Sequence, residues 1–416
     1  MSTRVVRRKP AVVVASALTA AALVALSACG SSSTNADGPG GNTSSPAKGG
    51  VSKVDVKLVS GGSGDVCQLS TASVPAGPVT FSVDNVSATA VNEVELLSDQ
   101  RILGEKENLA PGLGTETFTV TLGGGTYQVY CPGAAQEMTN LTVTGQAAPA
   151  ATGSVAQLLQ QGATQDATYA TAQITAMVSA TQKLQQAVDA GDLHQAQVDY
   201  AEARPYYERV ESDVDGFVLP GFKATDNAGN LDYLIDMRAS NLDPKVGWSG
   251  FHAVERDLFK DKKIDAGTKQ YAAKLTQHVK DLDSISKGLT YKPEDLANGA
   301  ADLLDEVQSS KITGEEEDFS HIDMVDFAAN VEGAEEAFAY LRPGLNKIDA
   351  SLAATVAQRF NDVDTMLDGY RDAKALGGYV RYTPAVKAKD ANKLSQTVQA
   401  LQDVLSSIAT KVATNS

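Results

Sequence analysis

The chain has 416 residues, of which 43% are hydrophobic and 21% are charged, so it is too long for one typical domain. Its 51 acidic and 35 basic residues give a net charge of −16, which repels phosphate backbones and argues against a nucleic-acid partner. Only three Cys and four His occur, which excludes a disulfide-stapled scaffold and a protein with several zinc ions. We therefore expect two or three domains, and a transition-metal site would have to rely mainly on carboxylates.

The N-terminus carries the pattern of a secretory leader. Four basic residues between Arg4 and Lys9 precede an uncharged run over residues 11–28 that is rich in Ala, Val and Leu. This predicts a signal peptide over residues 1–28. A transmembrane helix is the alternative, because about 20 apolar residues span a bilayer. The run ends in Leu-Ser-Ala-Cys, which resembles a bacterial lipobox, so we expect Cys29 to carry a lipid at the extracytoplasmic face of the cell membrane.

A short polar segment follows the predicted lipid anchor. Residues 29–50 are rich in Gly and Ser and poor in apolar side chains, which predicts a flexible tether. Without the leader, 31 basic and 51 acidic residues remain, a net charge of −20. Such a charge attracts cationic ligands at long range.

Residues 51–145 show apolar side chains at every second position in short segments, separated by clusters of Gly, Pro and Asn. This pattern predicts a small antiparallel β-sandwich. Its order, with Cys131 after a late strand and Met138 seven residues on, resembles a cupredoxin. A mononuclear blue-copper site needs two His beside the Cys, and no His precedes His194, so that kind of site is excluded.

Two interpretations of the remaining polar and sulfur-containing residues of this region stay open. Outside the cytosol, two Cys in a sandwich of this size typically form a disulfide, here between Cys67 and Cys131. The alternative is a second metal site, for copper or another redox metal, that draws on Cys67, Glu93, Cys131 and Met138.

The C-terminal region has the spacing of amphipathic helices. Residues 146–153 are rich in Gln, Ala, Pro and Thr and predict a linker. Over residues 154–416 apolar side chains recur at intervals of three and four, with breaks expected at prolines such as Pro205 and Pro343. We expect an all-α bundle of some six to nine helices, a fold that builds metal sites from inward-facing carboxylates and His.

The most informative helical segment spans residues 247–259. His252 and Glu255 are three residues apart, so both side chains lie on one helical face and can share a cation. The only Trp of the chain, Trp248, precedes them. The alternative is a polar pair that satisfies a helix interior, because a single His-x-x-Glu motif has low specificity.

Three sequence segments, in the order expected for the family, resemble the imelysin domain of EfeO-type iron-uptake lipoproteins. They are ARPYYERVES at residues 203–212, GFHAVERDLF at residues 250–259, and KITGEEEDFSHIDMVDFAANVEGA at residues 311–334. In full-length members this domain follows a cupredoxin-like domain, so the resemblance covers nearly all of the chain after the tether.

The resemblance implies a cupredoxin-like sandwich followed by an imelysin-like bundle. It also implies a role in the uptake of iron, as Fe²⁺ or Fe³⁺, together with a membrane iron permease and a secreted haem-containing peroxidase. The family's His-x-x-Glu metal site corresponds to His252 and Glu255. In the sandwich, Cys67, Glu93 and Cys131 fit the family pattern and Met138 is a looser match, which implies a metal-binding or electron-transfer role.

Further side chains are candidate ligands with a structural alternative each: Glu208, Glu211, His278, Glu316 and Asp323. Arg204 lies four residues before Glu208, so an ion pair is the alternative there. The acidic run of residues 315–318 would ordinarily be a solvated start of a helix. His278 would otherwise be a surface or interhelical residue, and the segment around Asp323 would support a site from outside its ligand shell.

These observations together predict an extracytoplasmic lipoprotein that captures iron through His-x-x-Glu and delivers it to a membrane permease. Copper or zinc would also suit the ligand types. The alternatives are a copper-handling or electron-transfer lipoprotein and a solute-binding lipoprotein for an organic ligand. The peptidase label that the imelysin family carries is not supported, because a zinc peptidase motif needs a second His at i+4. We therefore expect no enzymatic activity.

Overall fold

The computed structural model describes residues 50–98, 101–146, 152–214 and 216–416, which belong to one compact unit. The predicted signal peptide, the predicted lipidation site Cys29, and most of the predicted tether and linker lie outside these residues. No helix in the described ranges has the length and the apolar composition needed to cross a bilayer.

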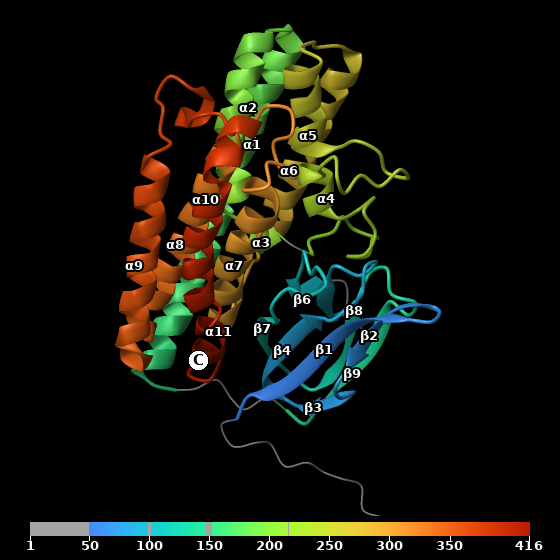
Figure 1. The fold of residues 1–416 in the computed structure, drawn as a ribbon, viewed down its shortest axis with the longest axis vertical. Coiled ribbons are helices and arrows are strands. Elements are labelled where there is room, and N and C mark those ends of the chain that lie inside the picture. Colours follow the sequence, from blue (N-terminus) through green and yellow to red (C-terminus); the bar gives the residue numbers. More distant parts are fainter. Residues whose placement is uncertain (1–49, 99–100, 147–151, 215) are drawn as a thin grey trace, which may run out of the picture. The chain divides into compact units, whose positions relative to one another are not determined.

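Two β-sheets form the first part of the described chain (Figure 1). One sheet has the order β2 (Gly64–Leu69), β1 (Ser52–Gly61), β4 (Gly77–Asn85), β7 (Glu116–Leu122). The other has the order β3 (Ser73–Pro75), β9 (Met138–Thr144), β8 (Gly125–Tyr130), β5 (Val94–Ser98), β6 (Arg101–Lys106). Most strand pairs are antiparallel, as predicted, and the β1–β4 and β3–β9 pairs, which are parallel, are the exceptions.

The period of two in the sequence explains the core of the sandwich. Val54, Val56 and Leu58 alternate along β1, and all three are fully buried. Phe81 and Phe118 stack between paired strands with their ring centroids 4.8 Å apart.

A helical bundle follows. Its α-helices are α1 (Ser154–Ala190), α2 (Leu193–Glu208), α3 (Glu211–Val214), α4 (Leu231–Asp236), α5 (Gly250–Glu255), α6 (Ala266–Ser286), α7 (Pro293–Glu306), α8 (Asp323–Ile348), α9 (Ala350–Asp368), α10 (Pro384–Leu405) and α11 (Ile408–Ala413). Two π-helical turns, η1 (Arg256–Lys260) and η2 (Val307–Lys311), and a 3₁₀ turn, η3 (Leu376–Gly378), complete the described elements. These eleven α-helices exceed the six to nine expected, because four of them are short segments of four to six residues, and the other seven have fourteen residues or more. The predicted order of a β region before an all-α region is confirmed.

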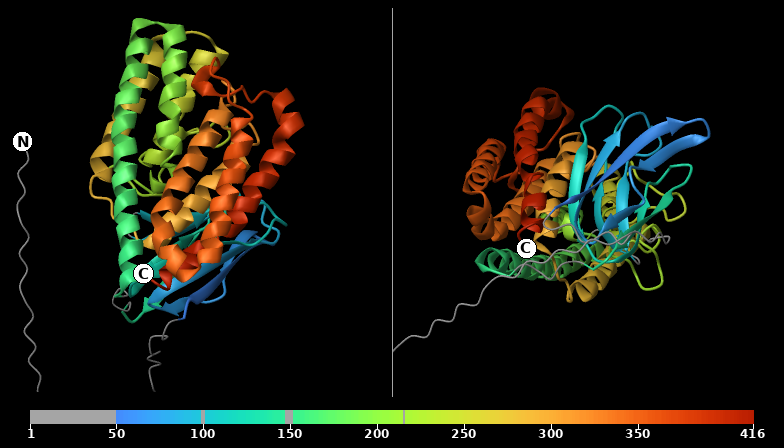
Figure 2. Two further views of the ribbon diagram at one scale, coloured as in Figure 1. Left: turned by 90° about the vertical axis from the view of Figure 1, so that its left-hand side faces the viewer. Right: turned by 90° about the horizontal axis from the view of Figure 1, so that it is seen from below.

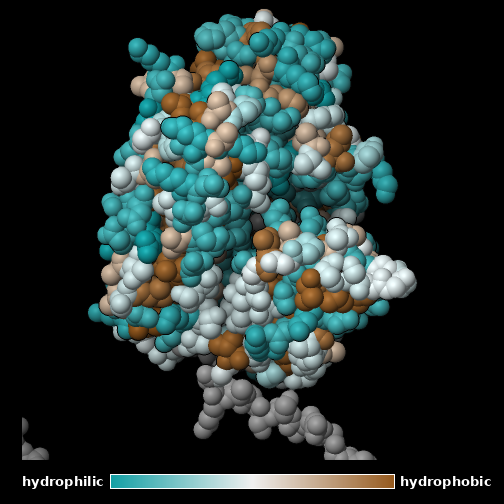
Figure 3. Space-filling view, in the orientation of Figure 1, coloured by the Kyte–Doolittle hydropathy of each residue, from teal (hydrophilic) through white to brown (hydrophobic). Residues whose placement is uncertain are grey.

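The long helices pack along one another. α1 runs in contact with α2, α6 and α8 (Figure 2). Pro205 and Pro343 lie inside α2 and α8, so the helix breaks predicted at these residues were wrong. A proline removes one backbone hydrogen bond, and the burial of Tyr207 beyond Pro205 and of Leu345 beyond Pro343 favours continuation of each helix. The face of the molecule shown in Figure 3 is largely hydrophilic, as the acidic composition predicts.

Candidate metal centre

A glycine brings two helices together where the centre lies. Gly250, the first residue of α5, has φ 71°, and a Cβ at this position would lie 2.0 Å from the carbonyl oxygen of Ile235 in α4. Only glycine therefore allows this approach. The contact places Asp236, the last residue of α4, beside His252 on α5.

The imidazole of His252 is enclosed by carboxylates. Its Nδ1 lies 3.1 Å from Glu255 Oε2, and its Nε2 lies 3.2 Å from Glu316 Oε1 and 3.5 Å from Asp236 Oδ1. Only 1% of His252 is exposed, and its carboxylate neighbours are similarly buried. Both ring nitrogens thus face carboxylate oxygens, and because the group is buried, water does not screen the charges of these carboxylates.

Glu255 is held by the chain that faces it. Its Oε1 accepts hydrogen bonds from the backbone N–H groups of Phe319, at 2.8 Å, and Ser320, at 2.7 Å. The other oxygen, Oε2, is left for His252. The carboxylate therefore has a fixed orientation, and it ties α5 to the loop between η2 and α8.

The acidic run in that loop is not a solvated surface. Glu316 is 1% exposed and Glu317 is fully buried. Tyr200 donates a hydrogen bond of 2.7 Å to Glu317 Oε1, and the hydroxyl of Ser320 donates to the other oxygen of Glu317. Buried carboxylates need such donors or a counter-charge, which the sequence pattern alone does not reveal.

Three cations supply the counter-charge. Arg204 donates to Glu208 and Asp236, and its Nη2 lies 2.9 Å from Glu316 Oε1. The Nζ of Lys311 lies 3.2 Å from oxygens of Glu208 and Glu316. The Nη1 of Arg238 lies 3.0 Å from Glu316 Oε2. Arg204 and Lys311 are themselves buried. Each of these cations therefore needs the carboxylates to offset its own loss of hydration, just as the carboxylates need the cations.

The electrostatics of the cluster push its pKa values apart. Burial alone would lower the pKa of His252, but Asp236 first, and then hydrogen bonds to Glu255 and Glu316, raise it well above its ordinary value. Burial would raise the pKa of Glu316, but Lys311 and Arg238 hold it well below its usual range.

Two neighbouring carboxyl groups have raised pKa values, in contrast to Glu316. Burial, with the charges of Glu255 and Asp326, raises the pKa of Glu317 well above its usual value. Burial also raises the pKa of Asp326 to about 7. The centre therefore holds both ionised carboxylates and groups that bind protons tightly, and a cation would compete with those protons.

Three sets of side chains bring ligand atoms within 4.8 Å of one another: Asp236, His252 and Glu316; His252, Glu255 and Glu317; and Glu208, Glu316 and Asp326. The first set shares His252 with the second and Glu316 with the third, so the three sets form one centre. Asp323 Oδ2 and Asp326 Oδ2 are buried without a hydrogen-bond partner among the described residues, which is the environment that a cation would satisfy. One imidazole among carboxylate oxygens suits iron, and also zinc, copper or manganese.

The structure brings together some of the predicted ligands and separates others. His252, Glu255, Glu208 and Glu316 meet in the centre. Asp323 lies next to it, with its Oδ1 accepting a hydrogen bond of 3.2 Å from the backbone N–H of Glu317.

Two predicted ligands have other partners. Glu211 accepts from Lys311 at 3.3 Å and from Asn330 at 3.1 Å. The Nδ1 of His278 lies 3.3 Å from the carbonyl oxygen of Leu234, and His278 joins none of the ligand sets found among the described residues.

Sequence reasoning missed three members of the centre, Asp236, Glu317 and Asp326. Glu317 was within the acidic run but was expected to be solvated. Asp326 lies three residues after Asp323 on α8, the same spacing that singled out His252 and Glu255, and this signal could have found it. Asp236 carries no local signal, because only the contact of α4 with Gly250 places it.

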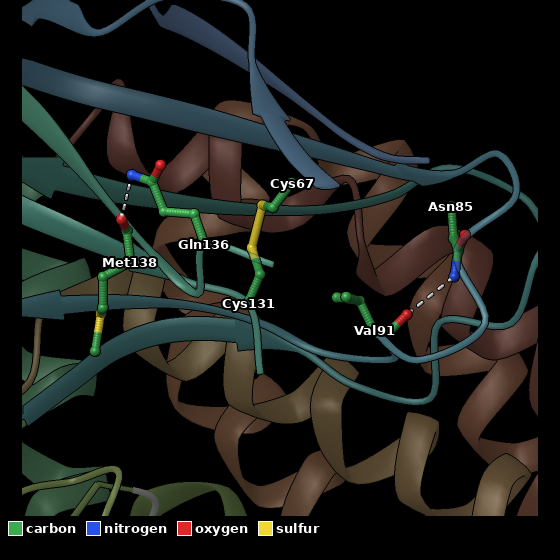
Figure 4. Close-up of a disulfide and its surroundings, with 6 residues drawn as sticks. All are labelled: Cys67, Asn85, Val91, Cys131, Gln136 and Met138. Carbon is green, nitrogen blue, oxygen red and sulfur yellow. Dashed lines mark hydrogen bonds between the residues drawn. A yellow bond between two sulfur atoms is a disulfide. The ribbon is translucent and has the colours of Figure 1, made fainter. Parts of the chain in front are cut away.

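In the sandwich, Cys67 and Cys131 are joined in a disulfide (Figure 4). A disulfide leaves no thiolate to bind a metal. The side chain of Met138 points away from the two sulfur atoms in Figure 4. Glu93 lies instead with Glu105 and Glu107, whose ligand atoms are within 4.8 Å of one another. The four residues proposed from the sequence therefore do not form one cluster.

The fold and the centre together define a two-domain protein, a β-sandwich followed by an α-helical bundle with a buried cluster of carboxylates around one imidazole. Residues 163–408 match the sequence profile of the imelysin family. The chain is 35% identical over 346 residues to "Iron uptake system component EfeO" of Escherichia coli (strain K12), which covers 82% of this chain and 88% of that protein. Proteins of the same name from Shigella flexneri and Shigella sonnei match with the same identity and coverage. The chain belongs to the imelysin family, and the resemblance inferred from the three sequence segments is confirmed.

Proposed function

We propose that the protein is a component of a bacterial iron-uptake system that binds iron in the helical bundle. The observation that carries this proposal is the position of His252, with each ring nitrogen next to a buried carboxylate and the whole group balanced by internal cations. The relatives named as iron-uptake components support iron as the cargo. Oxygen donors with a single imidazole agree with it.

The proposed ligands are His252 and Glu255, with Asp236 and Glu316 completing the set. A titration of the full mature chain with Fe²⁺ under anaerobic conditions, and with Fe³⁺ citrate, tests this. The double variant His252→Ala/Glu255→Ala should lose high-affinity iron binding. His278→Ala is the matched control, because it removes a partly buried His of the same bundle outside the centre. Undiminished binding in the double variant would refute the assignment.

The proposed cellular setting has two parts. Lipid on Cys29 would hold the protein at the outer face of the cell membrane, where a membrane permease would receive the iron and a haem-containing peroxidase would act with it. Replacement of Cys29 by Ala should release the protein from the membrane fraction and lower its mass by that of the lipid. An unchanged mass and unchanged membrane association would contradict the anchor.

We propose binding and delivery rather than catalysis. One His followed by Glu at i+3 lacks the second His that a zinc peptidase of the His-Glu-x-x-His type uses. Incubation of the purified protein with zinc and a mixture of unfolded protein substrates should leave those substrates intact, and metal-dependent cleavage that the His252→Ala variant loses would contradict this.

A second cation site in the sandwich is the other proposal. Glu93, Glu105 and Glu107 offer oxygens within 4.8 Å of one another, and Glu95, which is 6% exposed, has an Oε2 without a hydrogen-bond partner among the described residues. In a copper titration, the double variant Glu93→Gln/Glu107→Gln should bind one equivalent of copper fewer per chain than the wild type. Equal stoichiometry would rule this site out, and an intense visible band in the wild type would instead favour the copper-handling, electron-transfer alternative.

A further inference from the structure

The candidate metal centre is buried, so a cation needs a route to it. His252, Glu255 and Glu316 are each exposed by 1% or less. Asp236, which belongs to the centre, also lies in the wall of a narrow cleft of about 80 Å³. The other walls of this cleft come from β6, α3, α7 and the chain after α4. The cleft therefore touches the centre at one end.

The lining of this cleft is strongly acidic. Its carboxylates are Glu105, Glu107, Glu211, Asp232, Asp236, Asp302, Asp305 and Glu306. A neighbouring hollow of about 260 Å³ shares Glu105, Glu107 and Asp232 with it and continues to Glu93 and Glu95. Carboxylates thus line a continuous path from the sandwich to Asp236. Carboxyl groups outnumber the two cations of the lining, Lys106 and Arg238, and such an excess of acidic groups concentrates cations and raises their association rate.

The walls of the cleft are held in place. The Nζ of Lys106, on β6, lies 2.6 Å from Asp305 and also bonds to Asp302, both on α7. Lys106 is 4% exposed, so this pair of contacts is not a solvent-screened surface interaction. At the outer end, the buried Oε2 of Glu95 has no hydrogen-bond partner among the described residues and lies in the wall of the hollow.

Arg238 stands at the inner end of the path. Its Nη1 lies 2.8 Å from Glu306 Oε2 and 3.0 Å from Glu316 Oε2. Glu306 is in the cleft wall and Glu316 is in the centre, so this guanidinium bridges the two. Its side chain is 17% exposed, whereas the side chain of Glu316 behind it is fully buried.

We propose that this cleft is the route by which a divalent cation reaches the buried centre, and that Arg238 is the residue that the cation must pass. The inference rests on the proposed function, because it assumes that the centre binds iron. It adds that the sandwich and the bundle contribute one wall each to the route, so that cations collected between them arrive at Asp236 first.

The test measures rates as well as affinity. Fe²⁺ binding to the full mature chain is followed under anaerobic conditions by rapid mixing with a chelating indicator dye, which reports free Fe²⁺ in both directions. Asn241 is exposed in the cleft wall, and its Oδ1 accepts a hydrogen bond of 2.8 Å from the backbone N–H of Arg238. Asn241→Phe narrows the cleft without a change of charge. Asn241→Ala loses the same hydrogen bond without filling the cleft, and it is the matched control.

The expected result for Asn241→Phe is a parallel fall of the association and dissociation rate constants, with an unchanged Kd and with Asn241→Ala close to the wild type. A narrowed route slows passage equally in both directions, whereas damage to the centre would change the Kd. Unchanged rates in Asn241→Phe would overturn the route even though the wild type binds iron. Failure of the wild type to bind iron, by contrast, would overturn the proposed function.

A charge reversal at the mouth provides a second test. Glu107→Lys should lower the association rate constant by about tenfold or more at low ionic strength, and the difference should shrink as salt is added. Glu202→Lys, an equal charge change at an exposed position of α2 outside the cleft, is the control. Equal slowing by both substitutions would show only an effect of net charge and would count against the route.

Discussion

The Nδ1 of His252 lies 3.1 Å from Oε2 of Glu255, while the second oxygen of that carboxylate is held by the backbone of the facing loop. The three-residue spacing in α5 therefore does more than place two ligands on one helical face. It connects the imidazole, through Glu255, to the loop that carries Glu316 and Glu317. The helix that carries His252 and the acidic loop are thus positioned by the same carboxylate.

Removal of that carboxylate should destabilise the protein as well as weaken iron binding. Glu255→Ala leaves the N–H groups of Phe319 and Ser320 without their acceptor, which should cost about 1–3 kcal/mol in the free energy of unfolding. Urea denaturation of the metal-free protein measures this. Glu255→Gln, whose amide oxygen can still accept hydrogen bonds from both N–H groups, should cost less, and equal losses would contradict the assigned role of Glu255.

Arg204 should be essential to the metal-free fold. It lies among buried carboxylates, and Arg204→Met would leave Glu208 with Lys311 alone and Asp236 with His252 alone. Removal of one partner from a buried ion pair typically costs about 3–5 kcal/mol. A bound divalent cation would restore part of the missing positive charge, so iron should raise the Tm of the variant more than it raises the Tm of the wild type. An equal rise in both proteins would show that iron does not share the carboxylates of Arg204.

The approach of α4 to α5 can be tested at Gly250. Gly250→Ala places a side chain in the left-handed region, which costs about 1–2 kcal/mol, and also drives its Cβ into the carbonyl of Ile235. The variant should bind iron more weakly because Asp236 and His252 are forced apart. Gly247→Ala is the control, since Gly247 has φ 79° and open space around its Cβ position. Similar iron affinities of the two variants would mean that the close approach does not matter for the centre.

Iron affinity should rise with pH. The carboxylates around His252 raise its pKa well above the ordinary value, so the imidazole is protonated in the metal-free protein near neutral pH and must lose its proton to bind iron. Burial likewise favours the protonated form of Glu317. Lower pH adds protons that compete with the metal, so affinity should fall between about pH 8 and pH 5.

Calorimetry in buffers of different ionisation enthalpy measures the protons released on iron binding. Release should be smaller in His252→Ala than in the wild type, with Glu317 supplying the remaining protons, and equal release by both proteins would contradict the role of His252. The stability of the metal-free protein should respond in the opposite direction. A group whose pKa is raised by folding stabilises the fold below its unfolded pKa, and this contribution is lost as the pH rises through the folded value. The contribution of His252 should therefore decrease in alkaline solution.

Local patterns were sufficient for much of this description. Alternation with a period of two indicated β1, β4, β5, β7, β8 and β9 but not β2, β3 or β6, and the change to intervals of three and four indicated helices such as α1, α6 and α9. The i, i+3 spacing identified His252 with Glu255, and Glu208 and Glu316 were found among the acidic candidates. The breaks expected at Pro205 and Pro343 failed because packing on both sides of each proline outweighs one lost hydrogen bond.

The rest of the centre depends on contacts between distant segments. Asp236 is set by the glycine contact of α5, and Glu317 is buried because Tyr200 and Arg204 reach it from α2. Glu211 contacts Lys311 and Asn330 and lies outside the ligand sets that contain Glu208. No spacing within one helix encodes these contacts, because buried charges select their partners across the bundle.

The most direct test of the central claim is the position of bound iron. Crystals of the full mature chain grown with Fe²⁺ or Fe³⁺ should give an anomalous difference peak at the iron edge. The account predicts this peak within bonding distance of a nitrogen of His252 and of carboxylate oxygens from Glu255, Glu316 or Asp236. A helical domain without an anomalous peak at His252, in crystals that hold iron elsewhere in the chain, would contradict it.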